Sequence, residues 1–106
     1  MNQNIVVTST CSNEAEALRI AHELIDRSLA ACVQVVPGIR SVYRWQGKVE
    51  ESSEWLLLVK TDSAKFELLQ RTIHLLHSYE VPEILALPVL TGSEPYLAWM
   101  EEALRA

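Results

Sequence analysis

The chain has 106 residues, 49% of them hydrophobic and 22% charged, a composition typical of one folded globular domain and unlike that of a disordered chain. Its formal net charge of −5 argues against nucleic-acid binding, which needs clustered lysines and arginines. The longest wholly apolar run, residues 55–59, is too short to cross a bilayer, and residues 1–7 do not resemble a signal peptide. We therefore expect a single cytosolic domain, residues 1–106, with neither nucleic acid nor membrane as partner.

The first predicted elements are a strand and a helix. Residues 4–10, NIVVTST, are rich in β-branched side chains, which favour a strand. Asn13 is placed to cap the following helix, with Glu16 as its capping-box partner three residues later. Residues 14–29 then repeat apolar side chains every three or four positions, which predicts a helix that covers one face of a sheet.

A long hairpin is predicted over residues 31–61. Pro37-Gly38 interrupts its first strand as a bulge would, and Gly47 lies in the turn at residues 46–48. The returning strand ends in WLLLVK, which is apolar on both faces and typical of a central strand.

Three further elements complete the chain. Asp62 is placed to cap a second helix over residues 63–78. A fourth strand is expected at residues 84–90 and a short final helix at residues 94–104, with Pro95 in its first turn.

This order predicts an α+β fold of the ferredoxin-like βαββαβ class, with a four-stranded antiparallel sheet, the long central hairpin and a short C-terminal helix. Right-handed crossovers place strands one and three in the centre and strand two at an edge. A bare edge of that length invites pairing with another chain. We expect self-association as a ring, with three as the smallest expected number of chains.

Three stretches together resemble one known family. They are LAACVQVVPGIRSVYRWQGKVEESSEWLLLVKT at 29–61, YEVPEILALPVLTG at 79–92 and YLAWM at 96–100. They are similar to the CutA, or divalent-cation tolerance, proteins. The resemblance implies a ferredoxin-like fold, a homotrimer whose sheets join edge to edge, and a role tied to copper and other divalent metals.

The resemblance also implies a set of metal ligands. Members linked to copper use a cysteine in the first strand and two adjacent histidines before the V-P-E motif. In this chain those positions hold Ser9, Leu76 and His77. Cys11 lies two residues further along the same strand, on the same face as Ser9, and is a candidate replacement.

From the residues alone, His74 and His77 are neighbours at i and i+3 near the end of the second helix. Imidazoles together with Glu83 suit Cu(II) or Zn(II). The alternative is that both histidines are solvated near the helix C-terminus. The predicted metal set is His77, Cys11 and Glu83, for Cu(II) or another divalent ion that folding does not require.

A second hypothesis concerns Lys60, Tyr79 and Glu83, polar residues beside the ends of apolar strands. A subunit cleft that gathered them would bind a small anionic metabolite or a protein partner. The competing interpretation is structural: Lys60 forms an interfacial salt bridge with a carboxylate, and the tyrosine hydroxyl forms a hydrogen bond with the backbone.

Catalysis is the weakest hypothesis. Cys11 or Ser9 would be the nucleophile and His77 the base, but the spacing brings no third orienting group to them. There is no glycine-rich phosphate loop, and the two cysteines form no C-x-x-C motif. The sequence therefore predicts a protein that is not an enzyme.

Overall fold

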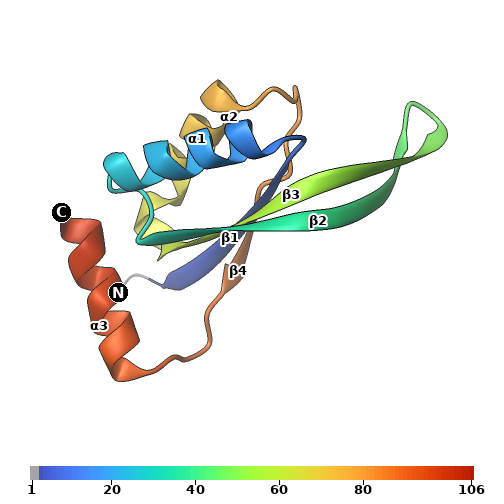
Figure 1. Ribbon diagram of the computed structural model, residues 1–106. Helices are drawn as coiled ribbons and strands as arrows, with labels where there is room; N and C mark the ends of the chain where they lie inside the picture. The colour runs from blue at the N-terminus through green and yellow to red at the C-terminus, as the bar shows by residue number, and fades with distance from the viewer. Residues whose placement is uncertain (1–2) are drawn as a thin grey trace.

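The strands and helices follow the predicted order in a computed structural model that describes residues 3–106 (Figure 1). They are β1 (Asn4–Cys11), α1 (Glu14–Asp26), β2 (Cys32–Trp45), β3 (Lys48–Asp62), the 3-10 turn η1 (Ser63–Lys65), α2 (Phe66–Leu76), β4 (Leu85–Pro88) and α3 (Glu94–Arg105). The strands form one antiparallel sheet in the order β2-β3-β1-β4, which confirms the ferredoxin-like fold with β1 and β3 in the centre. Within residues 3–106, no helix is both long and apolar enough to span a membrane.

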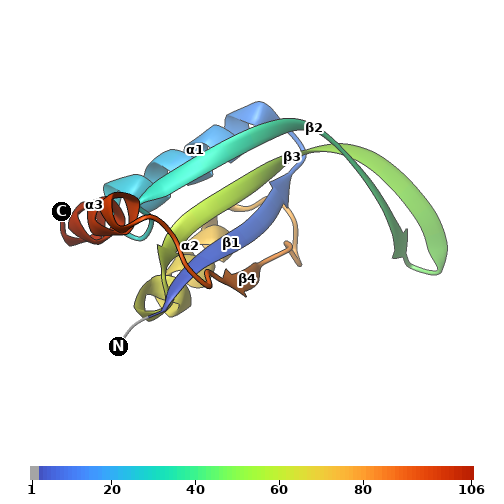
Figure 2. The same ribbon diagram turned by 90° about the horizontal axis from the view of Figure 1, so that it is seen from below.

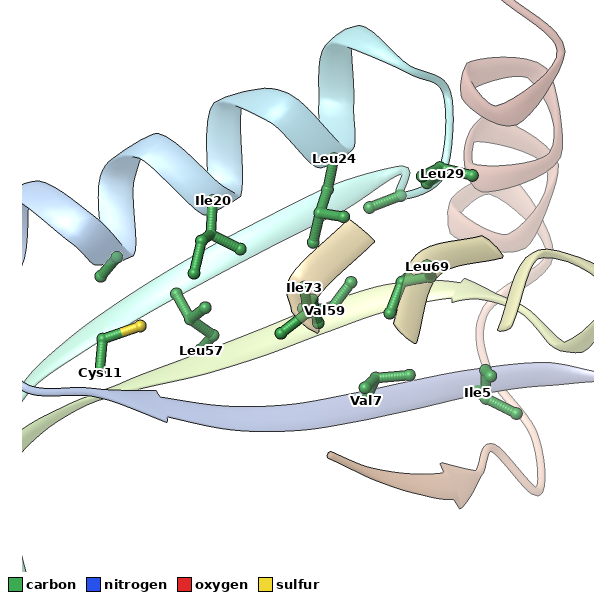
Figure 3. Packing of buried hydrophobic residues seen from close by; sticks show 12 residues of the cluster. Ile5, Val7, Cys11, Ile20, Leu24, Leu29, Leu57, Val59, Leu69 and Ile73 are labelled. Atoms are coloured by element: carbon green, nitrogen blue, oxygen red, sulfur yellow. The ribbon is translucent and has the colours of Figure 1, made fainter. Parts of the chain in front are cut away.

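The core lies between one face of the sheet and helices α1 and α2 (Figures 1 and 3). Side chains alternate between the two faces of a strand. The largest fully buried apolar residues of the core are Val7, Ile20, Leu24, Leu57, Val59, Leu69 and Ile73. Burying each such side chain stabilises the fold by about 1.5–3 kcal/mol. The packed core holds the ends of β1, α1 and α2 in fixed relative positions.

The opposite face of the sheet, which we call the open face, is not covered by α1 or α2. The strand register places on it Val6, Thr8, Thr10, Leu56, Leu58, Lys60, Leu85 and Leu87. Helix α3 lies at one end of this face, where Met100 and Leu104 pack against Ala31 in a small second cluster.

The long hairpin continues beyond the rest of the sheet (Figure 2). β1 pairs with β3 only from Trp55 to Asp62, so residues 39–54, here called the arm, consist of β2 and β3 alone. The predicted bulge is present as a register shift between Val36 and Ile39, with Gly38 at φ +76°. At the tip, the turn residues Gln46 and Gly47 both have positive φ.

The first helix ends three residues earlier than predicted, at Asp26 rather than Leu29. Ser28 adopts φ +56°, and the backbone N–H groups of Ser28 and Leu29 donate to the carbonyls of Ile25 and Leu24. This is a Schellman ending, in which an apolar residue just past the helix still contacts its last turn. Leu29 is therefore buried, which is why it matched the helical pattern.

The second helix is also shorter than predicted, because residues 63–65 form the 3-10 turn and α2 ends at Leu76. His77 is the C-cap and is extended, with φ −80° and ψ 141°. The expectation that His74 and His77 share one solvated helical face is wrong: His74 is exposed, whereas His77 is buried. The fourth strand covers only Leu85–Pro88 rather than residues 84–90, although the Val89 N–H still donates to the Asn4 carbonyl at 3.0 Å.

Candidate functional site

Three side chains that commonly bind metals meet where the end of β1 approaches the start of α1 and the end of α2. Cys11 is the last residue of β1, Glu16 lies in the first turn of α1, and His77 caps α2. One ligand atom from each lies within 4.8 Å of the other two. The structure thus brings together the predicted His77 and Cys11, and adds Glu16.

The imidazole of His77 is fully buried and both of its nitrogens have partners. Nε2 lies 2.7 Å from the carbonyl oxygen of Thr10 and 3.7 Å from the Sγ of Cys11. Nδ1 accepts a hydrogen bond of 3.0 Å from the backbone N–H of Tyr79. Because a carbonyl only accepts, these contacts assign the proton to Nε2 and leave Nδ1 as an acceptor.

Glu16 has a different role from the predicted capping box. Asn13 accepts from the N–H of Glu16, as expected, but the Glu16 carboxylate turns toward the end of α2. Its Oε1 accepts from the backbone N–H and the hydroxyl of Ser78, at 2.9 and 3.1 Å, and lies 3.2 Å from Nδ1 of His77. Burial alone would raise the pKa of Glu16, but the hydrogen bonds from Ser78 and the nearby His77 and Arg19 outweigh it and the pKa is lowered.

Cys11 is buried and its thiol is held in the protonated form. Desolvation, followed by the negative charges of Glu16 and Glu54, raises its pKa from 9.0 to about 12. Ser9, two residues earlier on the same face, is also buried, and its Oγ has no hydrogen-bond partner within the described residues 3–106. Cys11 and Cys32 are both free.

The Cys11, His77 and Glu16 side chains follow one another in space as a nucleophile, a base and an orienting carboxylate would. Sequence reasoning missed Glu16 as a third member. The details nevertheless oppose nucleophilic catalysis, because the thiol pKa is high and Nε2 already carries a proton bonded to Thr10. A base in that tautomer has no lone pair directed at the sulfur.

Glu83, the third predicted metal ligand, lies elsewhere. Its Oε2 accepts a hydrogen bond of 2.8 Å from the hydroxyl of Thr8, whose side chain is on the open face. Cys11 points to the helix-covered face of the same strand. Glu83 is accordingly not a member of the cluster formed by Cys11, Glu16 and His77.

A groove of about 580 Å³ lies at the root of the arm, on the open face. Its lining includes Thr10, Ser41, Tyr43, Glu54, Tyr79 and Glu83. Glu54 is only 7% exposed, and its two carboxylate oxygens accept from the hydroxyls of Tyr79 at 2.7 Å and Ser41 at 2.6 Å. Sequence reasoning missed Glu54; the signal was an acidic residue immediately before the apolar run 55–59.

The residues of the predicted anion site do not converge within one chain. Tyr79 bonds to Glu54, and burial together with this bond raises its pKa. Lys60 lies toward the other end of β3, where its Nζ is 3.4 Å from the hydroxyl of Tyr96 and 5.5 Å from the centre of that ring. The groove beside Tyr79 and Glu83 is instead lined by carboxylates.

A second hollow lies beside Glu16 and the end of α2, and Cys11 is not part of its lining. It has a volume of about 510 Å³ and is lined by residues of α1 and the end of α2, among them Glu16, Arg19, His77 and Ser78. Arg19 closes one side by donating to the carbonyl of Leu76 at 2.8 Å. An ion entering this hollow would meet Glu16, whereas the imidazole of His77 is fully buried.

Comparison with known proteins gives one consistent result. The family model described as CutA1 divalent ion tolerance protein matches residues 5–103. The divalent-cation tolerance protein CutA of Thermus thermophilus is 50% identical over 97 residues, which cover 92% of this chain and 94% of that protein. The chloroplastic protein CutA of Arabidopsis thaliana is 43% identical over 102 residues, or 96% of this chain; the chain spans 56% of that longer protein.

Solved structures agree with these relatives. The divalent cation tolerance protein Cut A1 of Thermus thermophilus superposes with a TM-score of 0.92 at 48% identity, covering 94% of this chain and 97% of that one. CutA of Xylella fastidiosa superposes with a TM-score of 0.93 at 36% identity, covering 96% and 98%. A relative from Archaeoglobus fulgidus is described as periplasmic.

Proposed function

Because this chain belongs to the CutA1 divalent ion tolerance family, we propose that it acts in metal tolerance by binding a divalent ion directly at Cys11 and His77, with Glu16 as their partner. The observation that carries the proposal is the convergence of a thiol, an imidazole and a carboxylate from three separate elements within 4.8 Å. This is a binding role rather than catalysis. The proposed location remains the cytosol.

The spacing of the two proposed ligands supports this assignment. Sγ of Cys11 and Nε2 of His77 are 3.7 Å apart. Two ligands at about 2.3 and 2.0 Å from one tetrahedral ion are separated by roughly 3.5 Å. The two atoms are therefore spaced for one ion, and binding requires that the hydrogen bond of Nε2 to the Thr10 carbonyl be broken.

Glu16 supports the same site from the other side of the ring. Oε1 of Glu16 and Nδ1 of His77 are 3.2 Å apart although both now accept hydrogen bonds. When Nε2 is a ligand, the imidazole proton resides on Nδ1 and is donated to Glu16. Metal-binding histidines usually donate their other N–H to a carboxylate in this way.

The ligand types indicate which ions fit. Thiolate and imidazole suit zinc and copper, and copper has the higher intrinsic affinity among divalent ions. Cys11 must lose its proton to bind, and its pKa of about 12 makes that step costly at neutral pH. Binding should therefore release a proton and strengthen as the pH rises.

Calorimetric titration with Cu(II) and Zn(II) tests the proposal. The wild type should bind, whereas His77→Ala and Cys11→Ser should lose the binding heat. His74→Ala is the matched control, because His74 is an exposed histidine of α2 outside the cluster. Titrations of the wild type in two buffers of different ionisation enthalpy should show about one proton released. Equal binding by wild type and His77→Ala would refute the site.

The proposed assembly is a homotrimer. β2 is an uncovered edge, and Leu85 and Leu87 on the open face are 59% and 52% exposed in the single chain. Light scattering should give three chains of 12.0 kDa each. Leu87→Lys should dissociate them, while Leu75→Lys, on an exposed position of α2, should not. A wild-type monomer at micromolar concentration would contradict the assembly.

A further inference from the structure

A single residue, Tyr79, connects the Cys11–Glu16–His77 cluster with the groove at the root of the arm. Its backbone N–H donates to Nδ1 of His77 at 3.0 Å, and the two rings lie 4.7 Å apart at 46°. Its hydroxyl donates to Glu54 at 2.7 Å. Tyr79 therefore contacts both His77 on the helix-covered side of the sheet and Glu54 on its open face.

Glu54 carries this connection into the arm. It is paired with Ile39 at the first position of the arm, and its second carboxylate oxygen accepts from Ser41. The carboxylate is nearly buried and has no salt bridge among the described residues, so the two hydroxyl donors are its main compensation. Removing one donor from a buried carboxylate is destabilising because its charge is then less well solvated.

We propose that metal binding at His77 is transmitted through Tyr79 and Glu54 and loosens the root of the arm. The inference rests on the proposed metal site and adds a regulatory consequence to it. The arm carries Val42, Tyr43 and Trp45 as exposed apolar side chains, so its position affects any surface that it offers to another chain.

The reason is that the Tyr79 N–H loses its acceptor whichever nitrogen of His77 binds the ion. If Nδ1 is the ligand, its lone pair is occupied. If Nε2 is the ligand, the single proton of the neutral ring moves to Nδ1, which then donates to Glu16 and faces the Tyr79 N–H as a second donor. In both cases the backbone of Tyr79 must shift, and its hydroxyl is displaced from Glu54.

Hydrogen exchange of the intact protein, with and without saturating Zn(II), measures this coupling. Zinc is suitable because it has no redox chemistry. In the wild type, zinc should accelerate exchange of backbone amides in residues 39–54 by at least about fivefold, the lower end of typical coupling between sites. Calorimetry on the same samples reports whether zinc is bound.

Tyr79→Phe keeps the backbone N–H and the ring but removes the donor to Glu54. This variant should still bind zinc, while its arm exchanges fast with or without the ion. Ser41→Ala removes the other donor but keeps the Tyr79–Glu54 bond, so its arm should exchange faster than that of the wild type without zinc and accelerate further when zinc binds. Tyr43→Phe is the control: it removes a hydroxyl from the same groove whose partner is Ser52 rather than Glu54, and should keep the zinc response.

The outcomes separate the two proposals. Zinc binding by the wild type without a change in the arm would overturn the coupling and leave the metal site intact. An unchanged zinc response in Tyr79→Phe would also overturn it. Absence of zinc binding in the wild type would refute the metal site and, with it, the coupling.

Discussion

The buried hydroxyl of Thr61 donates a hydrogen bond of 2.7 Å to the carbonyl oxygen of Leu29, joining the end of β3 to the segment that follows α1. Thr61→Val keeps the shape but removes the donor, which leaves a buried carbonyl without this partner. We expect a loss of about 1–3 kcal/mol in the free energy of unfolding, measured by urea denaturation. Thr8→Val, at a half-buried position whose carboxylate partner can turn to water, should cost less than about 0.5 kcal/mol.

The local features of the fold could be predicted because each depends on a few neighbouring residues. Asn13 caps α1 by accepting from the Glu16 N–H, Asp62 caps the 3-10 turn η1 rather than α2 itself by accepting from the Ala64 N–H, and Gly38 lies in the predicted bulge. The sheet order follows from the element order and the handedness of crossovers. These predictions required no knowledge of which distant side chains meet.

The candidate site was predicted only in part, because its members meet through packing of segments far apart in the chain. Glu16 matches a capping box, yet its carboxylate bonds to Ser78, 62 residues away. His77 continues the helical pattern in sequence, but α2 ends one residue before it. Glu83 belongs to the predicted metal set because carboxylates and imidazoles suit the same ions, but it bonds to Thr8 on the open face of β1, whereas His77 contacts Cys11 on the helix-covered face.

Acid should weaken the link that Glu16 makes between α1 and the end of α2. Its pKa in the folded protein is below its ordinary value of 4.5, so the unfolded chain binds the proton more readily. The carboxylate therefore contributes its full stability above pH 4.5 and loses it as the pH falls through the lowered folded pKa. The free-energy difference between wild type and Glu16→Gln should be constant near neutral pH and shrink below pH 4.5.

Urea denaturation at a series of pH values measures this difference. Glu14→Gln is the control for loss of one charge in the first turn of the same helix, since Glu14 is exposed. A difference for Glu16→Gln that grows as the pH falls below 4.5 would show that the carboxylate does not stabilise the fold as described.

Cys11 should resist alkylation in the folded protein. With a pKa of about 12, only about one thiol in ten thousand is ionised at pH 8, and the side chain is fully buried. In a Cys32→Ser background, iodoacetamide should label Cys11 only after guanidinium is added, as followed by mass spectrometry. The reciprocal Cys11→Ser variant leaves the partly exposed Cys32 and should react without denaturant. Rapid labelling of native Cys11 would argue against the buried, protonated thiol.

The tip of the arm offers a test of the turn geometry. Trp45 pairs with Lys48, so Gln46 and Gly47 form a two-residue turn with φ of 50° and 80°. Turns of this type need positive φ at both positions, and asparagine tolerates that conformation better than glutamine. The left-handed conformation costs most L-residues about 1–2 kcal/mol. Gln46→Asn should recover about 0.5 kcal/mol of that cost and raise the unfolding midpoint, whereas the β-branched Gln46→Val should lower it. If valine at position 46 were as stable as asparagine in urea denaturation at equal protein concentration, the turn would not have this backbone conformation.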